Sequence, residues 1–153
     1  MPRLSALATL GLCLVAAASC SLSGASVQDA APRYQAASDA YQSAILQAAG
    51  TIQTTTPAPG TVAAAMGSME RATRKFLGDL RQISFPDGMQ PHLSTMESDS
   101  RSLADQDHLL FTEAGNLPRA DVARWNQLDS AWRSDDKQLR NDLSLPIPDF
   151  DNR

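Results

Sequence analysis

The chain has 153 residues, 42% of them hydrophobic, and a formal net charge of −4. This length suits one small domain with a single core. The acidic balance excludes a basic surface that would neutralise a phosphate backbone, so we expect no nucleic-acid partner.

Residues 1–19 have the features of an export signal. Arg3 supplies a positive charge, residues 4–15 form a mostly apolar run, and small residues lead from there to Cys20. The apolar run is shorter than the roughly 20 residues that a membrane-spanning helix needs. We therefore expect residues 1–19 to be a signal peptide that is removed during export.

The end of this segment, Ala17-Ala18-Ser19-Cys20, resembles the bacterial lipobox. In a lipobox, small residues precede a cysteine that receives a diacylglyceryl group and becomes the mature N-terminus. We therefore predict that Cys20 is lipidated and anchors the protein to the extracytoplasmic face of the cell membrane. Ala17 stands where the pattern usually has leucine. The alternative is an ordinary signal peptide cleaved at Ala16-Ala17-Ala18, which would leave Cys20 as a free thiol.

The mature chain has to fold without an internal disulfide. Cys13 is the second of the two cysteines and lies inside the signal segment, so cleavage removes it. Loss of Arg3 leaves 12 basic against 17 acidic residues, a net charge of about −5. Because anionic headgroups would repel such a body, attachment to the membrane has to come from the acyl chains.

Helix-breaking residues divide the mature chain. Residues 20–31 are small and polar and predict a flexible tether, residues 32–145 the folded domain, and residues 146–153 a C-terminal tail. Within the domain, breaks at residues 50–60, 85–88 and 115–118 leave four pieces.

Each piece carries apolar residues at helical spacing. The first has Tyr34, Ala37, Tyr41, Ala44, Ile45 and Ala48. The second has Val62, Met66, Met69, Thr73, Phe76, Leu80 and Ile83. The third has Met89, Leu93, Met96, Leu103, Leu110 and Phe111. The fourth has Val122, Trp125, Leu128, Trp132, Leu139 and Leu143. Since these positions repeat in steps of three and four, we predict an all-α fold, an antiparallel up-down-up-down four-helix bundle.

Two carboxylates interrupt the apolar stripes. Asp107 shares a helical direction with Met89 and Met96, and Asp136 lies between Trp125 and Leu139 on its own helix. A carboxylate in a bundle core needs a cation, a hydrogen-bond donor or a metal ion, or it stays protonated. Asp107 and Asp136 are therefore candidates for a polar site between the third and fourth helices. In the alternative, both sit at a wet edge and pair with arginines, for which the candidates are Arg71, Arg74 and Arg133.

Metal and cofactor chemistry has few candidates. A di-metal bundle site needs Glu-x-x-His pairs, and neither His92 nor His108 follows a glutamate at that spacing. His108 is expected to be a solvated residue. The methionines at core positions, Met66, Met69, Met89 and Met96, are expected to fill gaps rather than bind copper. We therefore expect no metal site and no cofactor.

No catalytic motif is present in the sequence. The chain has no Gly-x-Ser-x-Gly, no nucleotide-binding glycine loop and no mature cysteine free for nucleophilic work. The sequence thus predicts a protein that is not an enzyme.

Several features together resemble the small, alanine-rich helical lipoproteins of actinomycete-type bacteria. These are the signal with its lipobox cysteine, the tyrosines of the first helix, Leu80-Arg-Gln-Ile-Ser-Phe-Pro86, and the closing Leu139-Arg-Asn-Asp-Leu-Ser-Leu-Pro146. The resemblance spans most of the chain and implies a helical fold and an envelope location. That group has no assigned activity, so the resemblance implies no chemistry.

The function that these features favour is that of a non-catalytic envelope lipoprotein. Its bundle would bind a protein or a small ligand at the outer surface of the membrane. Two alternatives remain open at this point: a solute or metal sensor that uses a site between helices, and an envelope enzyme with an unrecognised site.

Overall fold

The structure is a computed structural model that describes residues 25–53 and 57–149 of the chain. Four long helices account for most of this part: α1 (Val27–Ile52), α2 (Pro59–Leu80), α3 (Gln90–Thr112) and α4 (Arg119–Asp142). A short 3-10 helix, η1 (Asp87–Met89), precedes α3. The described residues contain no strand, so the predicted all-α class is confirmed. The signal segment and Cys20 lie outside the described residues.

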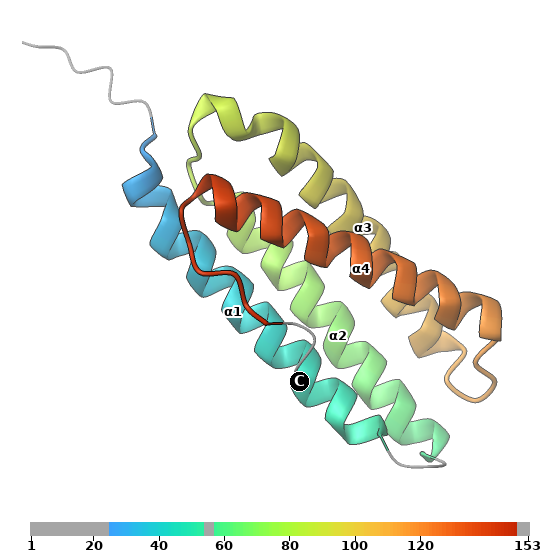
Figure 1. Ribbon diagram of the computed structural model, residues 1–153. Coiled ribbons are helices and arrows are strands. Elements are labelled where there is room, and N and C mark those ends of the chain that lie inside the picture. Colours follow the sequence, from blue (N-terminus) through green and yellow to red (C-terminus); the bar gives the residue numbers. More distant parts are fainter. Residues whose placement is uncertain (1–24, 54–56, 150–153) are drawn as a thin grey trace, which may run out of the picture.

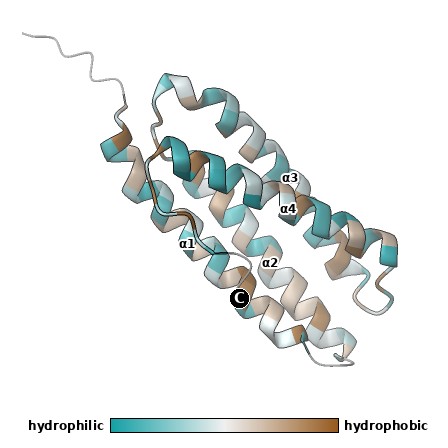
Figure 2. Ribbon diagram, viewed as in Figure 1, coloured by the Kyte–Doolittle hydropathy of each residue, from teal (hydrophilic) through white to brown (hydrophobic). Residues whose placement is uncertain are grey.

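The four helices lie side by side as a bundle (Figure 1). Helix α1 packs against α2, α2 against α3, and α3 against α4, whereas the backbones of α1 and α4 seldom approach each other. Apolar residues recur along each helix, and many residues of α4 are hydrophilic (Figure 2). None of the described helices is long and apolar enough to cross a membrane.

Helix α1 begins earlier than the sequence suggested. Ser26 is its N-cap, and the Ser26 Oγ accepts a hydrogen bond of 3.1 Å from the backbone N–H of Asp29. The helix then continues through Pro32, whose ring removes only one backbone hydrogen bond. Ala30 and Tyr34 are both completely buried, and the packing of their side chains stabilises the start of α1. Residues 27–31, expected to be part of the tether, therefore belong to α1.

Prolines mark the starts of the other long helices. Pro59 and Pro91 occupy the first turn of α2 and α3, and Pro118 is the N-cap of α4. Backbone N–H groups in a first turn have no partner inside the helix, so a proline there costs no hydrogen bond. The expected breaks at residues 85–88 and 115–118 are thus confirmed, while the first break is narrower because α1 continues through Gly50 to Ile52.

Helix α4 ends in a Schellman motif. Ser144 adopts the left-handed φ of 56°, Leu145 N–H donates to the Arg140 carbonyl at 2.8 Å, and Ser144 N–H donates to the Asn141 carbonyl at 3.0 Å. This turn reverses the chain, so the segment that follows runs back beside α1 (Figure 1).

The core follows the predicted stripes with two corrections. Aromatic rings from three helices meet at its centre: Tyr41 and Trp132 have ring centroids 4.3 Å apart, and Phe76 lies 5.4 Å from Trp132. Phe111 and Val122 were expected in the stripes, but they are 43% and 37% exposed. Phe111 directly follows Leu110, and the rotation of about 100° between successive helical residues is enough to bring its side chain out of the interior. Val122 lies in a part of α4 that buries no side chain.

Two phenylalanines test this assignment. Phe76 is 1% exposed and contacts rings of α1 and α4, so Phe76→Ala should lower the free energy of unfolding by about 3–5 kcal/mol. Phe111→Ala makes the same chemical change at an exposed position and should cost about 1 kcal/mol or less. Urea denaturation measures both, and equal losses would contradict the assignment of the core.

Candidate functional site

Asp107 and Asp136 are both completely buried, but they do not share one site. Asp136 faces α1, and Asp107 bonds to side chains of α2 and α4. The expected pocket between the third and fourth helices is therefore replaced by two separate hydrogen-bonded networks. The expected alternative of a wet edge is wrong for both residues.

The Asp136 network joins α4 to α1. The carboxylate accepts hydrogen bonds from the Tyr34 hydroxyl at 2.8 Å, the Ser38 hydroxyl at 2.6 Å and the Gln42 amide at 3.2 Å. One turn further along α4, the Arg140 Nε donates to Asp136 Oδ2 at 2.9 Å. Four donors thus surround this buried carboxylate, which is the arrangement that a charge in a protein interior requires.

Arg140 extends the network outward. It is only 2% exposed, and its Nη2 donates to the Ser38 hydroxyl at 2.8 Å and to Asp39 at 2.5 Å. Its Nη1 donates to the Pro146 carbonyl at 3.1 Å, which ties the C-terminal segment to the bundle. Burial alone would lower the pKa of Arg140, but the carboxylates of Asp39 and Asp136 outweigh it and raise that pKa. The guanidinium therefore stays charged.

The burial of Arg140 was not foreseen from the sequence, and neither were the roles of Tyr34, Ser38 and Gln42. One signal was available: Asp136 and Arg140 are four residues apart, a spacing that brings opposite charges together on a helix. Ser38 and Gln42 repeat the same spacing on α1 and could have been paired with it. Tyr34 was placed in the apolar stripe, where its ring does pack, and its hydroxyl adds a polar contact.

Asp136→Asn should therefore destabilise the protein. The amide presents two N–H donors to a site already filled with donors, and among the described ion pairs of Arg140 it leaves the one with the half-exposed Asp39. We expect a loss of about 3 kcal/mol in the free energy of unfolding. Asp39→Asn is the matched control, because Asp39 is 52% exposed and should cost well under about 1 kcal/mol. Equal effects in denaturation curves would contradict this assignment.

Asp107 has a different environment. Its Oδ1 accepts a hydrogen bond of 2.6 Å from the Trp125 indole Nε1, and its Oδ2 lies 3.0 Å from the Thr73 hydroxyl. No ion pair reaches Asp107 among the described residues. Asp107 is thus a buried acid whose two hydrogen-bond partners, Thr73 and Trp125, are neutral.

The single hydroxyl proton of Thr73 indicates the protonation state of Asp107. The Thr73 Oγ lies 2.9 Å from the Met69 carbonyl and 3.0 Å from Asp107 Oδ2, but a hydroxyl has one proton to donate. When that proton goes to the Met69 carbonyl, the bond to Asp107 needs a proton on the carboxyl group. A protonated Asp107 therefore satisfies both contacts at once.

The electrostatics favour the same state. Burial raises the pKa of Asp107 to about 7, while the hydrogen bonds from Trp125 and Thr73 partly oppose this and the charges of Glu70 and Asp129 add to it. Burial also raises the pKa of the Tyr41 hydroxyl well above its usual range, and the charges of Asp107 and Asp129 act in the same direction.

Asp107→Asn tests this protonation state. Since the folded-state pKa of Asp107 lies above its unfolded value, wild type should lose stability as the pH rises from about 4 to about 7 and lose no more from this group above that. An asparagine can accept from Trp125 and donate to Thr73 at any pH. We expect it to be nearly neutral at about pH 5 and stabilising by about 2–4 kcal/mol at about pH 7.5.

The measurement is urea denaturation of both proteins at the two pH values, and the difference between them isolates Asp107. Burial and the neighbouring Asp99 raise the pKa of Asp135 to about 6, and Asp135 contributes equally to both proteins. The difference between the two proteins therefore removes its contribution. A difference that does not change with pH would show that Asp107 is ionised in the folded protein throughout.

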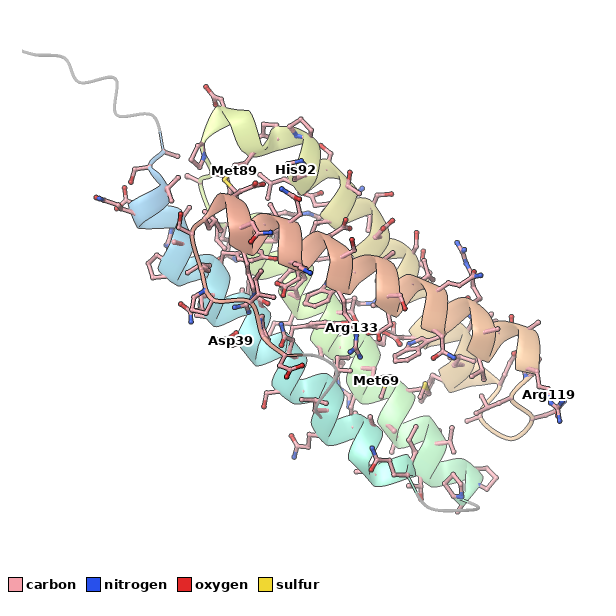
Figure 3. All side chains as sticks on the ribbon, viewed as in Figure 1. Asp39, Met69, Met89, His92, Arg119 and Arg133 are labelled. Atoms are coloured by element: carbon pink, nitrogen blue, oxygen red, sulfur yellow. The ribbon has the colours of Figure 1, made fainter. Side chains whose placement is uncertain are left out.

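The arginines proposed as partners bind elsewhere. Arg74 Nε pairs with Glu70 at 2.9 Å, and Arg133 Nε pairs with Asp129 at 2.8 Å. Arg71 donates to the Ser68 hydroxyl at 2.9 Å. Each of these contacts lies within one helix at a spacing of three or four residues. Arg133 projects from α4 near the middle of the bundle (Figure 3).

Both histidines lie at the surface in pairs with acids. His92 Nδ1 lies 2.5 Å from Asp142 and connects α3 with α4, and His108 Nδ1 lies 3.1 Å from Glu70. The side chain of His108 is 56% exposed, as expected for a solvated residue. Within residues 25–53 and 57–149, no three His, Cys, Asp or Glu side chains converge to hold a metal ion.

A small cavity opens between α1 and α4 beside the central rings. It measures about 60 Å³, and Tyr41, Ile45, Asp129 and Trp132 contribute to its lining. Neither Asp107 nor Asp136 lines it. This volume holds a few water molecules, whereas sites for small molecules commonly measure about 300–1,000 Å³.

Comparison of this chain with known protein families, with curated proteins and with solved structures finds no significant match. Function therefore has to be argued from the sequence and from the site geometry described above.

Proposed function

We propose that the mature protein is a non-catalytic lipoprotein of the cell envelope, of the kind found in actinomycete-type bacteria. Acyl chains on Cys20 would anchor it to the extracytoplasmic face of the cell membrane. Behind the cleaved signal peptide, an antiparallel up-down-up-down bundle would present a binding surface to an envelope protein or a small ligand. The observation that carries this proposal is the position of Cys20, after an apolar signal and directly before a folded domain.

The start of α1 limits how far the bundle can move from such an anchor. Residues 21–26 are the whole connection between Cys20 and Val27, and six residues extend at most about 20 Å. The bundle would therefore stay close to the headgroups. The start of α1 lies at the same end of the bundle as the connection between α2 and α3, so this end would face the membrane (Figure 1).

The interior supports binding at the surface more than chemistry or an enclosed ligand. Asp136 and Arg140 are hydrogen-bonded to each other and to neighbouring side chains. The cavity between α1 and α4 is too small for most solutes, whereas the larger hollows, of about 580 Å³ beside Phe85 and about 550 Å³ between α1 and α2, are open to the surface. A solute or metal sensor with a site between helices is therefore the less favoured candidate, and a protein partner on the surface is the more favoured one.

Metabolic labelling with a palmitate analogue tests the anchor. Wild-type protein produced in its own host should carry the label and fractionate with membranes, because the Cys20 thiol accepts the diacylglyceryl group. Cys20→Ser should carry no label and should leave the membrane fraction or accumulate unprocessed.

Cys13→Ser is the matched control, since it also replaces a cysteine but lies inside the signal segment. It should be labelled as strongly as wild type. An unlabelled wild-type band, or a label that survives in Cys20→Ser, would contradict the lipid anchor.

A further inference from the structure

The two halves of α4 are held to the bundle very differently. Residues 119–127, its first half, include no buried side chain. The second half buries Leu128, Asp129, Trp132, Asp136, Leu139 and Arg140. At the start of α4, Arg119 extends away from the bundle (Figure 3). The connection before it, residues 113–118, is also without a buried side chain. The first half of α4 is thus attached without a fully buried side chain, through half-buried ones such as Trp125 and, in the connection, Ala114 and Leu117.

Within the part of the chain that the structure describes, two hydrogen bonds join residues 119–127 to α3. The Trp125 indole Nε1 donates to Asp107 Oδ1 at 2.6 Å, and its half-buried ring packs against the core. The Gln106 side-chain amide donates to the Asp121 carbonyl at 3.1 Å. Both contacts go to neighbouring residues of α3, and only the first involves a group that can change its charge.

We propose that Asp107 and Trp125 form a proton-operated latch that holds the first half of α4 against the bundle. With a proton on Asp107, the carboxyl group is neutral, fits its buried position and accepts from Trp125. When Asp107 loses the proton, a charge without a cation partner is left in the interior. Moving residues 119–127 outward lets water reach that charge, and few buried contacts oppose the movement.

The charged groups around Asp107 favour this response. From α2, Glu70 faces Asp107 with its own negative charge; Arg74 pairs with Glu70, and His108 Nδ1 lies 3.1 Å from it. From α4, Asp129 adds a second negative charge and is bonded to Arg133. From α1, the neutral Tyr41 hydroxyl is near enough for Asp107 to act on its pKa. The surrounding acids therefore oppose ionisation in the closed form.

Linkage gives the direction and size of the effect. Burial and the nearby acids hold the pKa of Asp107 at about 7 in the closed form, and hydration would return it to near 4 in the open form. Between these values, opening releases a proton. The opening constant should then rise about tenfold for each pH unit and level off above about pH 7. The latch is closed in acid and loosened at neutral pH.

Opening would uncover the interior at the end of the bundle that carries the connection between α3 and α4. That end lies opposite the start of α1 (Figure 1). If the proposed anchor holds the start of α1 at the membrane, the latch would operate at the far end. The latch itself does not depend on the anchor.

Hydrogen exchange of the full-length protein in mild detergent tests the latch. Backbone amides are followed by mass spectrometry at about pH 5 and about pH 7, and rates are corrected for the intrinsic base-catalysed change. We expect the opening constant of residues 119–127 to rise about 100-fold over this interval, and that of α2 to change far less.

Two variants separate the latch from a general effect on stability. Asp107→Asn keeps both hydrogen bonds without a titratable proton, so residues 119–127 should stay closed at both pH values. Trp125→Phe keeps an apolar ring but removes the indole donor, so the same segment should exchange faster than wild type at about pH 5.

Three results would overturn the proposal. One is an equal pH response in all four helices, which would mean that Asp107 acts only on global unfolding. Another is an unchanged opening constant in residues 119–127 of wild type. The third is a pH response of Asp107→Asn that matches wild type.

Discussion

The hydrogen-bonded network around Asp136 and Arg140, which crosses from α4 to α1, is the interaction on which the closure of this bundle depends. The backbones of α1 and α4 seldom meet, so long side chains have to fill the space between them. In one half of that space, Tyr34, Ser38 and Gln42 donate from α1 to a carboxylate on α4. Arg140 completes the network and also holds the Pro146 carbonyl, which brings the C-terminal segment to the same seam. The buried charges can stabilise the fold because the carboxylate and the guanidinium bond to each other and to polar groups around them.

The second buried acid shows how much environment decides what a carboxylate does. Asp107 and Asp136 are equally inaccessible to solvent. Asp136 has a guanidinium and three further donors as partners, whereas Asp107 has an indole and a hydroxyl. The first arrangement stabilises a charge, and the second favours a proton. The Asp136 network therefore gives the bundle a fixed register, while Asp107 makes one part of it responsive to pH.

The two networks bear on function mainly because they occupy the interior, which leaves the surface as the place for a binding site. A bundle whose internal polar groups are mostly bonded to each other offers little interior space for a solute, and the cavity beside Trp132 is small. For the proposed binding function, the exterior and the segments that can move are then the candidate contact surfaces. The first half of α4 combines both properties, because most of its side chains are exposed and one of the two hydrogen bonds described for it goes to a titratable group.

The sequence by itself determined the helical class, the approximate breaks between helices and most of the core. Apolar residues at steps of three and four define a buried face whatever the neighbours are, and prolines and glycines interrupt helices through local geometry. It also marked Asp107 and Asp136 as candidates for inward-facing carboxylates, with a wet edge as the alternative. Only the tertiary structure decided that they belong to different networks, because their partners lie up to 102 residues away along the chain. Periodicity reports which way a side chain points on its own helix, and it carries no information about which donor the facing helix places opposite.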